Sequence, residues 1–102
     1  MRTCIPLVQY ASGRMIGARE SAISLRSQLD EAIVSGVDII FDFARVEVTQ
    51  SFIDELVGSL ILRFGPDILD KLVFKSCSDD VRAIIKFVVA DRVDQYLKRN
   101  SH

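Results

Sequence analysis

The chain is poor in the residue types that build catalytic, metal and disulfide sites. Its 102 residues include no tryptophan, two cysteines and one histidine, which is the last residue, His102. A general base at a chain end is not held in geometry, so a Ser-His or Cys-His pair is disfavoured. Cys4 and Cys77 have neither the spacing of a zinc or redox motif nor the number needed for a disulfide scaffold. We expect strand thiols at both positions, and no catalytic residue, metal or cofactor.

Long apolar runs, glycine-rich motifs and an excess of one charge are also missing. No apolar run approaches the roughly 20 residues that cross a bilayer, and the glycines form neither a dinucleotide-binding nor a P-loop pattern. Thirteen basic and fourteen acidic residues give a net charge of −1. This balance argues against nucleic acid or an anionic membrane as the main partner. The N-terminal residues resemble no secretory signal, so a cytoplasmic location is expected.

The composition that remains is typical of a globular protein. Hydrophobic residues make up 49% of the chain and charged residues 26%, with two prolines and five glycines. A chain of this length supports one small domain. We therefore predict a single domain over residues 1–102, with a core over about 3–92 and a C-terminal tail at 93–102 that docks as a last turn or frays.

The spacing of apolar residues predicts alternating strands and helices. The predicted strands are 4–10, 14–18, 37–43 and 69–76, the second of which is short and pairs with the first as a hairpin. Three helices are predicted, with N-caps at Ser24, Ser51 and Ser78. Ser35-Gly36 ends the first helix, Gly65-Pro66 ends the second, and the third runs towards Ala90. This order indicates an α/β fold with a four-stranded, mostly parallel or mixed sheet.

The strand 37–43 shows how the sheet is covered. Apolar residues alternate along it with Asp38, Ile40 and Asp42, so one face is wholly apolar and the other carries two carboxylates. We expect helices mainly on the apolar face and water or a partner on the other. Pro6 restricts strand 4–10 to a sheet edge, which allows a weak homodimer as well as a monomer.

The segment IFDFARVEVTQSFIDEL, at 40–56, joins the central strand to the second helix. It resembles the STAS fold of sulfate transporters and anti-sigma factor antagonists. It resembles more closely the STAS-like domain of unknown function found in bacteria, archaea and some phages. The matching residues are Ser24-Leu25-Arg26-Ser27, Asp42-Phe43, Val46, 51–56 and 75–81, where Cys77 replaces an expected asparagine. The resemblance covers about residues 15–90.

The resemblance implies a non-catalytic regulatory or protein-interaction module. Its partner surface would be the 44–55 loop and helix start, and its first expected partner a histidine-kinase-like ATPase. Ser51 occupies the position that a kinase phosphorylates in the antagonists. Two features depart from that pattern: bulky Phe52 and Ile53 follow the serine, and Asp54 and Glu55 would repel an added phosphate. Ser51 is therefore either a regulated phosphorylation site or a plain N-cap that forms a box-like pair with Asp54.

Two arginines have alternative roles. The family places an arginine near the start of the first helix, where Arg26 would hold a carboxylate such as Asp42 or Asp54; otherwise it is a solvated helix charge. Arg45 lies in the exposed loop and is either a surface residue or a partner contact.

Two other functions are also consistent with the sequence. One is an enzyme or small-ligand-binding domain, built around a pocket of Arg26, Asp42, Asp54 and Glu55. The carboxylates are also explained by solvation and by the helix dipole. The other is a phage or mobile-element accessory protein that binds and blocks a host factor.

Overall fold

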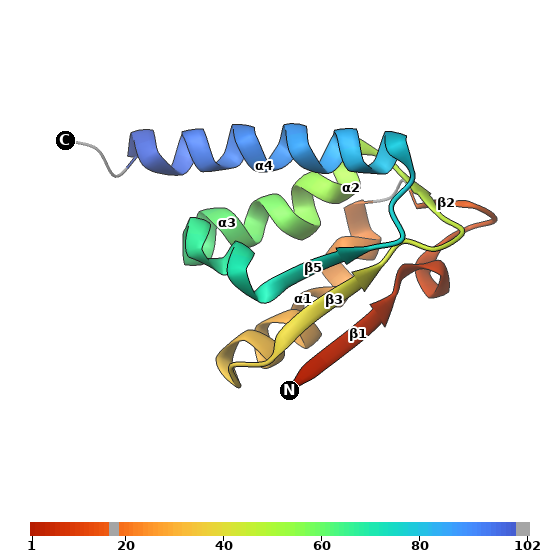
Figure 1. Cartoon of the computed structure of the whole chain (residues 1–102), viewed down its shortest axis with the longest axis horizontal. Coiled ribbons are helices and arrows are strands. Elements are labelled where there is room, and N and C mark those ends of the chain that lie inside the picture. The colour runs from red at the N-terminus through yellow and green to blue at the C-terminus, as the bar shows by residue number, and fades with distance from the viewer. Residues whose placement is uncertain (17–18, 100–102) are drawn as a thin grey trace.

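The fold was obtained from a computed structural model that describes residues 1–16 and 19–99. Strands and helices alternate along the chain (Figure 1). The strands are β1 (Arg2–Pro6), β2 (Met15–Ile16), β3 (Asp38–Asp42), β4 (Glu47–Val48) and β5 (Leu72–Lys75). The α-helices are α1 (Arg19–Val34), α2 (Gln50–Ile53), α3 (Ser59–Phe64) and α4 (Asp79–Arg99). Between them lie the 3₁₀ segments η1 (Leu7–Tyr10) and η3 (Pro66–Lys71) and the π-helical segment η2 (Asp54–Gly58).

The main sheet has three parallel strands in the order β1-β3-β5. The predicted four-stranded sheet is not confirmed, because β2 and β4 form a separate parallel pair. The predicted hairpin is wrong: after Pro6 the chain turns into η1, and Met15 pairs with Glu47 in the loop after β3. Residues 17–18 of that predicted strand lie outside the described residues.

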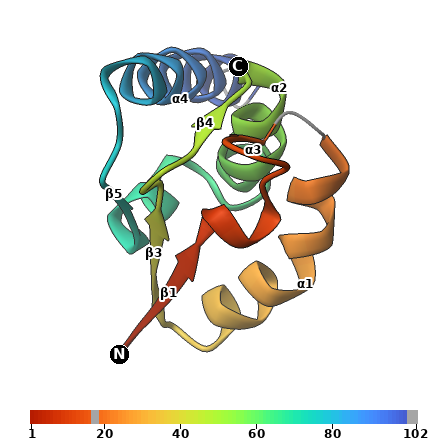
Figure 2. The ribbon, with the colours of Figure 1, turned by 90° about the vertical axis from the view of Figure 1, so that its right-hand side faces the viewer.

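The helices lie mainly on one side of the main sheet (Figure 2). On the covered face, Ile5, Ile39 and Phe41 are buried at adjacent positions of β1 and β3. On the other face, Cys4, Ile40 and Val73 form one row across the three strands, and Val73 is 44% exposed. The alternation predicted for the central strand is therefore confirmed.

The core fills the space between this covered face and the helices. Buried side chains come from α1, from the helix that runs through α2, η2 and α3, and from α4. The largest of them that are fully buried include Phe41, Phe43, Phe52, Leu25 and Leu60. Burying one such side chain stabilises the fold by about 1.5–3 kcal/mol.

The predicted cap at Ser24 is wrong because α1 already includes Arg19. Ala22 is buried three residues before Leu25, so the apolar stripe extends further back than the prediction allowed. The Ser24 hydroxyl donates to the Ser21 carbonyl at 2.9 Å, which satisfies it inside the helix.

The ends of the other helices agree better with the ends predicted from the sequence. Gly36 (φ 74°) follows α1, Gly65 (φ 89°) follows α3, and the Ser78 hydroxyl accepts from the Val81 N–H at 3.2 Å. Strand β5 is shorter than predicted, because the preceding residues form η3.

Helix α4 continues to Arg99, where a tail was predicted. Val93 packs against the core, and Tyr96 approaches Gly65, so contacts with the rest of the chain hold the last turns. Among the described residues, no helix has the length and apolarity needed to cross a membrane.

Candidate functional site

The loop between β3 and α2 is anchored at both ends. At its start, Asp42 accepts a hydrogen bond from the Ala44 N–H at 3.0 Å, which closes a local turn. Val46 and Val48 are buried, and β4 pairs with β2. Arg45 lies between these anchors with a left-handed backbone (φ 66°) and an exposed side chain. The loop therefore presents Arg45 on a fixed backbone.

The N-cap of α2 is Thr49, not Ser51 as predicted. The Thr49 Oγ1 accepts from the Phe52 N–H at 3.2 Å. Ser51 lies in the first turn and is exposed. Both residue types favour the cap position, and the sequence pattern could not choose between two such residues so close together.

Arg26 pairs with Glu55. It does hold a carboxylate, as one of the two alternatives expected, but the carboxylate is neither Asp42 nor Asp54. The Arg26 guanidinium contacts the Glu55 carboxylate at 2.8 Å, which joins α1 to η2. The Arg26 side chain is 43% exposed and that of Glu55 is 21% exposed.

Asp54 is held by Arg92, which sequence reasoning did not single out. The Arg92 Nε and Nη2 both donate to the Asp54 carboxylate, so the contact is bidentate and joins η2 to α4. This hydrogen bond raises the pKa of Arg92 above its ordinary value. Gly58 lies against both side chains, and the contact fits because glycine has no Cβ. A Cβ at this position would lie 2.9 Å from Asp54 Oδ1. No local sequence pattern links residues so far apart.

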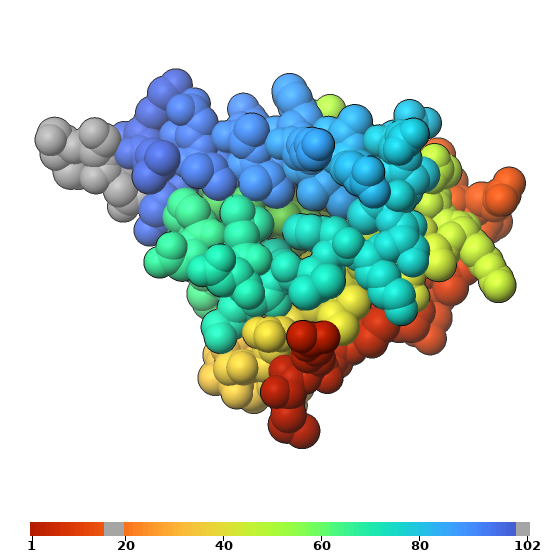
Figure 3. Space-filling view, in the orientation of Figure 1, coloured from red at the N-terminus to blue at the C-terminus, as the bar shows by residue number. Residues whose placement is uncertain are grey.

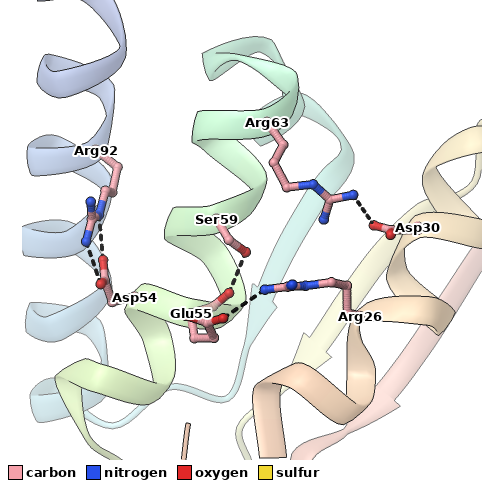
Figure 4. Close-up of polar contacts among 7 residues, drawn as sticks. All are labelled: Arg26, Asp30, Asp54, Glu55, Ser59, Arg63 and Arg92. Atoms are coloured by element: carbon pink, nitrogen blue, oxygen red, sulfur yellow. Dashed lines mark hydrogen bonds and ion pairs between the residues drawn. The ribbon is translucent and has the colours of Figure 1, made fainter. Parts of the chain in front are cut away.

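The proposed pocket of four charged residues is not assembled. Asp54 faces α4, Glu55 faces α1, and each has its own arginine (Figure 4). Asp42 closes its own turn. The ion pairs therefore fix the middle helix between its two neighbours. In the described part of the chain, no group of three or more His, Cys, Asp or Glu side chains could hold a metal ion.

A cleft of about 600 Å³ opens instead at the carboxyl ends of β3 and β5. Three segments surround this cleft: the turn before β2, the loop after β3 and the start of α4. Figure 3 shows these segments together at one end of the molecule. Of the predicted site residues, Arg45 lines this cleft. Its other lining residues are Arg14, Phe43, Val46, Glu47, Ser76, Cys77 and Ser78. In open parallel sheets, ligands bind outside the carboxyl ends of the strands, which was the available signal for this location.

Cys77 lies in this cleft and follows β5 rather than forming part of it, whereas Cys4 lies in β1 as predicted. Burial raises the pKa of the Cys77 thiol, and the charge of Arg82 opposes that rise. A raised pKa keeps the thiol protonated at neutral pH, which does not favour a nucleophilic role.

The family model that matches this sequence covers residues 21–82 and is described as a STAS-like domain of unknown function. The chain belongs to this family. The matched range includes Arg26, the 44–55 segment and the cleft residues 76–78 after β5, whereas Arg14 and Arg92 lie outside it. The comparisons with curated proteins and with solved structures found no match.

Proposed function

We propose that this STAS-like domain is a non-catalytic regulatory module that binds a protein partner. The contact region is the 44–55 surface, which consists of the loop after β3 and the first turns of the following helix. Its exposed side chains are Arg45, Gln50 and Ser51. The observation that carries the proposal is that these exposed side chains lie next to buried ones, Val46, Val48, Phe52 and Ile53, which anchor the same short segment.

The 44–55 surface is anchored by contacts within the chain. Thr49 caps the helix, and the neighbouring α1 and α4 hold Glu55 and Asp54 through their arginines. A surface that is already ordered loses less conformational entropy on binding, which favours its use as a recognition site.

Ser51 is suited to regulate this surface. Its side chain is exposed in the first turn of the helix, where N–H groups and the positive end of the helix dipole favour an added phosphate. The repulsion expected from Asp54 and Glu55 is reduced, because each carboxylate is paired with an arginine. Phosphorylation would place negative charge in the middle of the partner surface and thereby weaken binding.

A histidine-kinase-like ATPase is the partner class to test first, because the resemblance to anti-sigma factor antagonists implies it. The experiment is affinity capture from a lysate of the source cells, using the wild-type chain, Ser51→Asp and Ser27→Asp. Ser27 is an exposed serine of α1 and gives the same charge change outside the 44–55 surface. Mass spectrometry identifies the captured proteins and any phosphate on the bait.

The proposal expects one such ATPase with the wild-type chain and with Ser27→Asp, and its loss with Ser51→Asp. Capture of no specific partner, or equal capture by both variants, would contradict it.

A further inference from the structure

The cleft at the carboxyl ends of β3 and β5 is lined by Arg14 and Arg45, whose side chains have no polar partner among the described residues. Arg26, Arg63 and Arg92 each form an ion pair within the protein. In contrast, no ion pair or side-chain hydrogen bond of Arg14 or Arg45 occurs within residues 1–16 and 19–99. Their guanidinium groups are therefore available to a ligand.

The pairing of β2 with β4 brings these two arginines to the same cleft. The Glu47 N–H donates to the Arg14 carbonyl at 2.7 Å, which ties the turn that carries Arg14 to the loop that carries Arg45. Both side chains line the cleft although they are distant in sequence.

The charges that line the cleft are unequal. Among the described residues that line the cleft, Glu47 alone is acidic, and the Ser78 hydroxyl donates to that carboxylate at 2.9 Å. Asp79 and Asp80 are exposed in the first turn of α4, but neither lines the cleft. The described lining thus carries two arginines and one carboxylate. A guanidinium binds a carboxylate in a planar, bidentate geometry.

We propose that this cleft docks an acidic segment of the partner protein, whose Asp and Glu carboxylates bind Arg14 and Arg45. The inference rests on the proposed function and names the partner chemistry. Arg45 belongs to both the cleft and the 44–55 surface, so a partner that covers one reaches the other. The cleft is open, with Arg45, Ser76 and Ser78 exposed, whereas small-ligand sites bury most of the ligand. An extended protein segment fits such a site better than a small anion does.

The test uses the full ¹⁵N-labelled chain and a capped peptide of five glutamates, followed by NMR at low salt. A capped peptide of five glutamines is the neutral control, and inorganic phosphate at matched ionic strength is the small-anion control. We expect saturable shifts at residue 14, at 45–47 and at 76–78 with the glutamate peptide alone. Added salt weakens the binding, because the cleft is exposed.

Variants then locate the binding site. Arg14→Gln and Arg45→Gln should each weaken peptide affinity about tenfold, since each removes a charge-assisted hydrogen bond. Arg2→Gln removes the same charge at the opposite, N-terminal end of β1 and should leave affinity unchanged. All three side chains are exposed, so each variant should keep the wild-type circular dichroism spectrum.

Three outcomes overturn the inference: no saturable shift with the glutamate peptide, binding of phosphate instead of the peptide, or an equal loss with Arg2→Gln. The proposed function is tested separately by Ser51→Asp. If the peptide fails to bind but Ser51→Asp still abolishes partner capture, the docking inference is wrong and the interaction module remains.

Discussion

At the scale of single residues, Thr49 and Ser51 have different roles. The Thr49 Oγ1 caps the helix, whereas Ser51 is exposed two positions later. Thr49→Ala should lower the free energy of unfolding by about 1 kcal/mol, because the Phe52 N–H loses its acceptor. Ser51→Ala should change it by less than about 0.5 kcal/mol. Urea unfolding followed by circular dichroism measures both, and equal effects would show that Thr49 is not the stabilising cap.

Gly58 provides a second test at this scale. In an open helix, Gly→Ala stabilises by about 1 kcal/mol. Here the new Cβ would lie 2.9 Å from Asp54 Oδ1 and 3.1 Å from Arg92 Cγ, so the bidentate ion pair must move. We expect Gly58→Ala to lower the free energy of unfolding by about 1 kcal/mol net.

The matched control for Gly58→Ala is the same substitution in an Arg92→Ala background. Removing Arg92 leaves space for the new methyl group, and the Asp54 carboxylate is then free to turn away. The substitution should be neutral or stabilising there. An equal cost in both backgrounds would contradict the proposed conflict with the ion pair.

At the scale of elements, one helix connects the rest of the helical layer. Residues 50–64 form a helix interrupted by the π-helical segment η2, which places consecutive carboxylates towards opposite neighbours. Asp54 reaches α4 and Glu55 reaches α1. The orientation of the helix start, and so of the 44–55 surface, depends on both contacts.

The last turns of α4 give a prediction at the same scale. The Tyr96 ring packs against Gly65, so closely that a Cβ added to Gly65 would lie 3.2 Å from the Tyr96 hydroxyl. Leu97, the next residue, is 57% exposed. Tyr96→Ala should lower the free energy of unfolding by about 1–2 kcal/mol through lost apolar burial. Leu97→Ala should change it by less than about 0.5 kcal/mol. If thermal and urea unfolding show no difference between them, the end of α4 does not stabilise the fold.

At the scale of the whole molecule, stability should be highest in the central strand. Strand β3 pairs on both sides, while β2 and β4 share one two-residue ladder. We expect the amides of residues 39–42 to exchange with solvent much more slowly than those of 47–48, as hydrogen exchange followed by NMR will measure. Comparable protection would mean that the loop and the core open together as one unit.

Much of the fold was predictable because its signals are local. Apolar alternation located β3, and helical spacing predicted a helix over 51–64, which in the structure begins at Gln50. Gly36, Gly65 and Ser78 marked real boundaries, since glycine tolerates positive φ and serine caps a helix. The family resemblance rests mainly on the 40–56 segment, with shorter matches near 24–27 and 75–81, and the family match confirms it.

The candidate site was less predictable, because contacts between distant residues define it. Asp54 and Glu55 were recognised as notable, but which arginine each would meet depends on how α1 and α4 cross the middle helix. Arg14 was not singled out, because its position beside Arg45 follows from the pairing of β2 with β4.

The order of the main elements, the covered face of the sheet and the family can therefore be derived from the residues alone, because periodicity, caps and turn residues act within a few positions of the chain. The pairing of the short strands, the partners of the charged residues and the cleft lined by Arg14 and Arg45 follow instead from how distant segments pack together. The energy of an ion pair or a strand pair depends on the distance between the groups in space, and a linear pattern does not encode that distance.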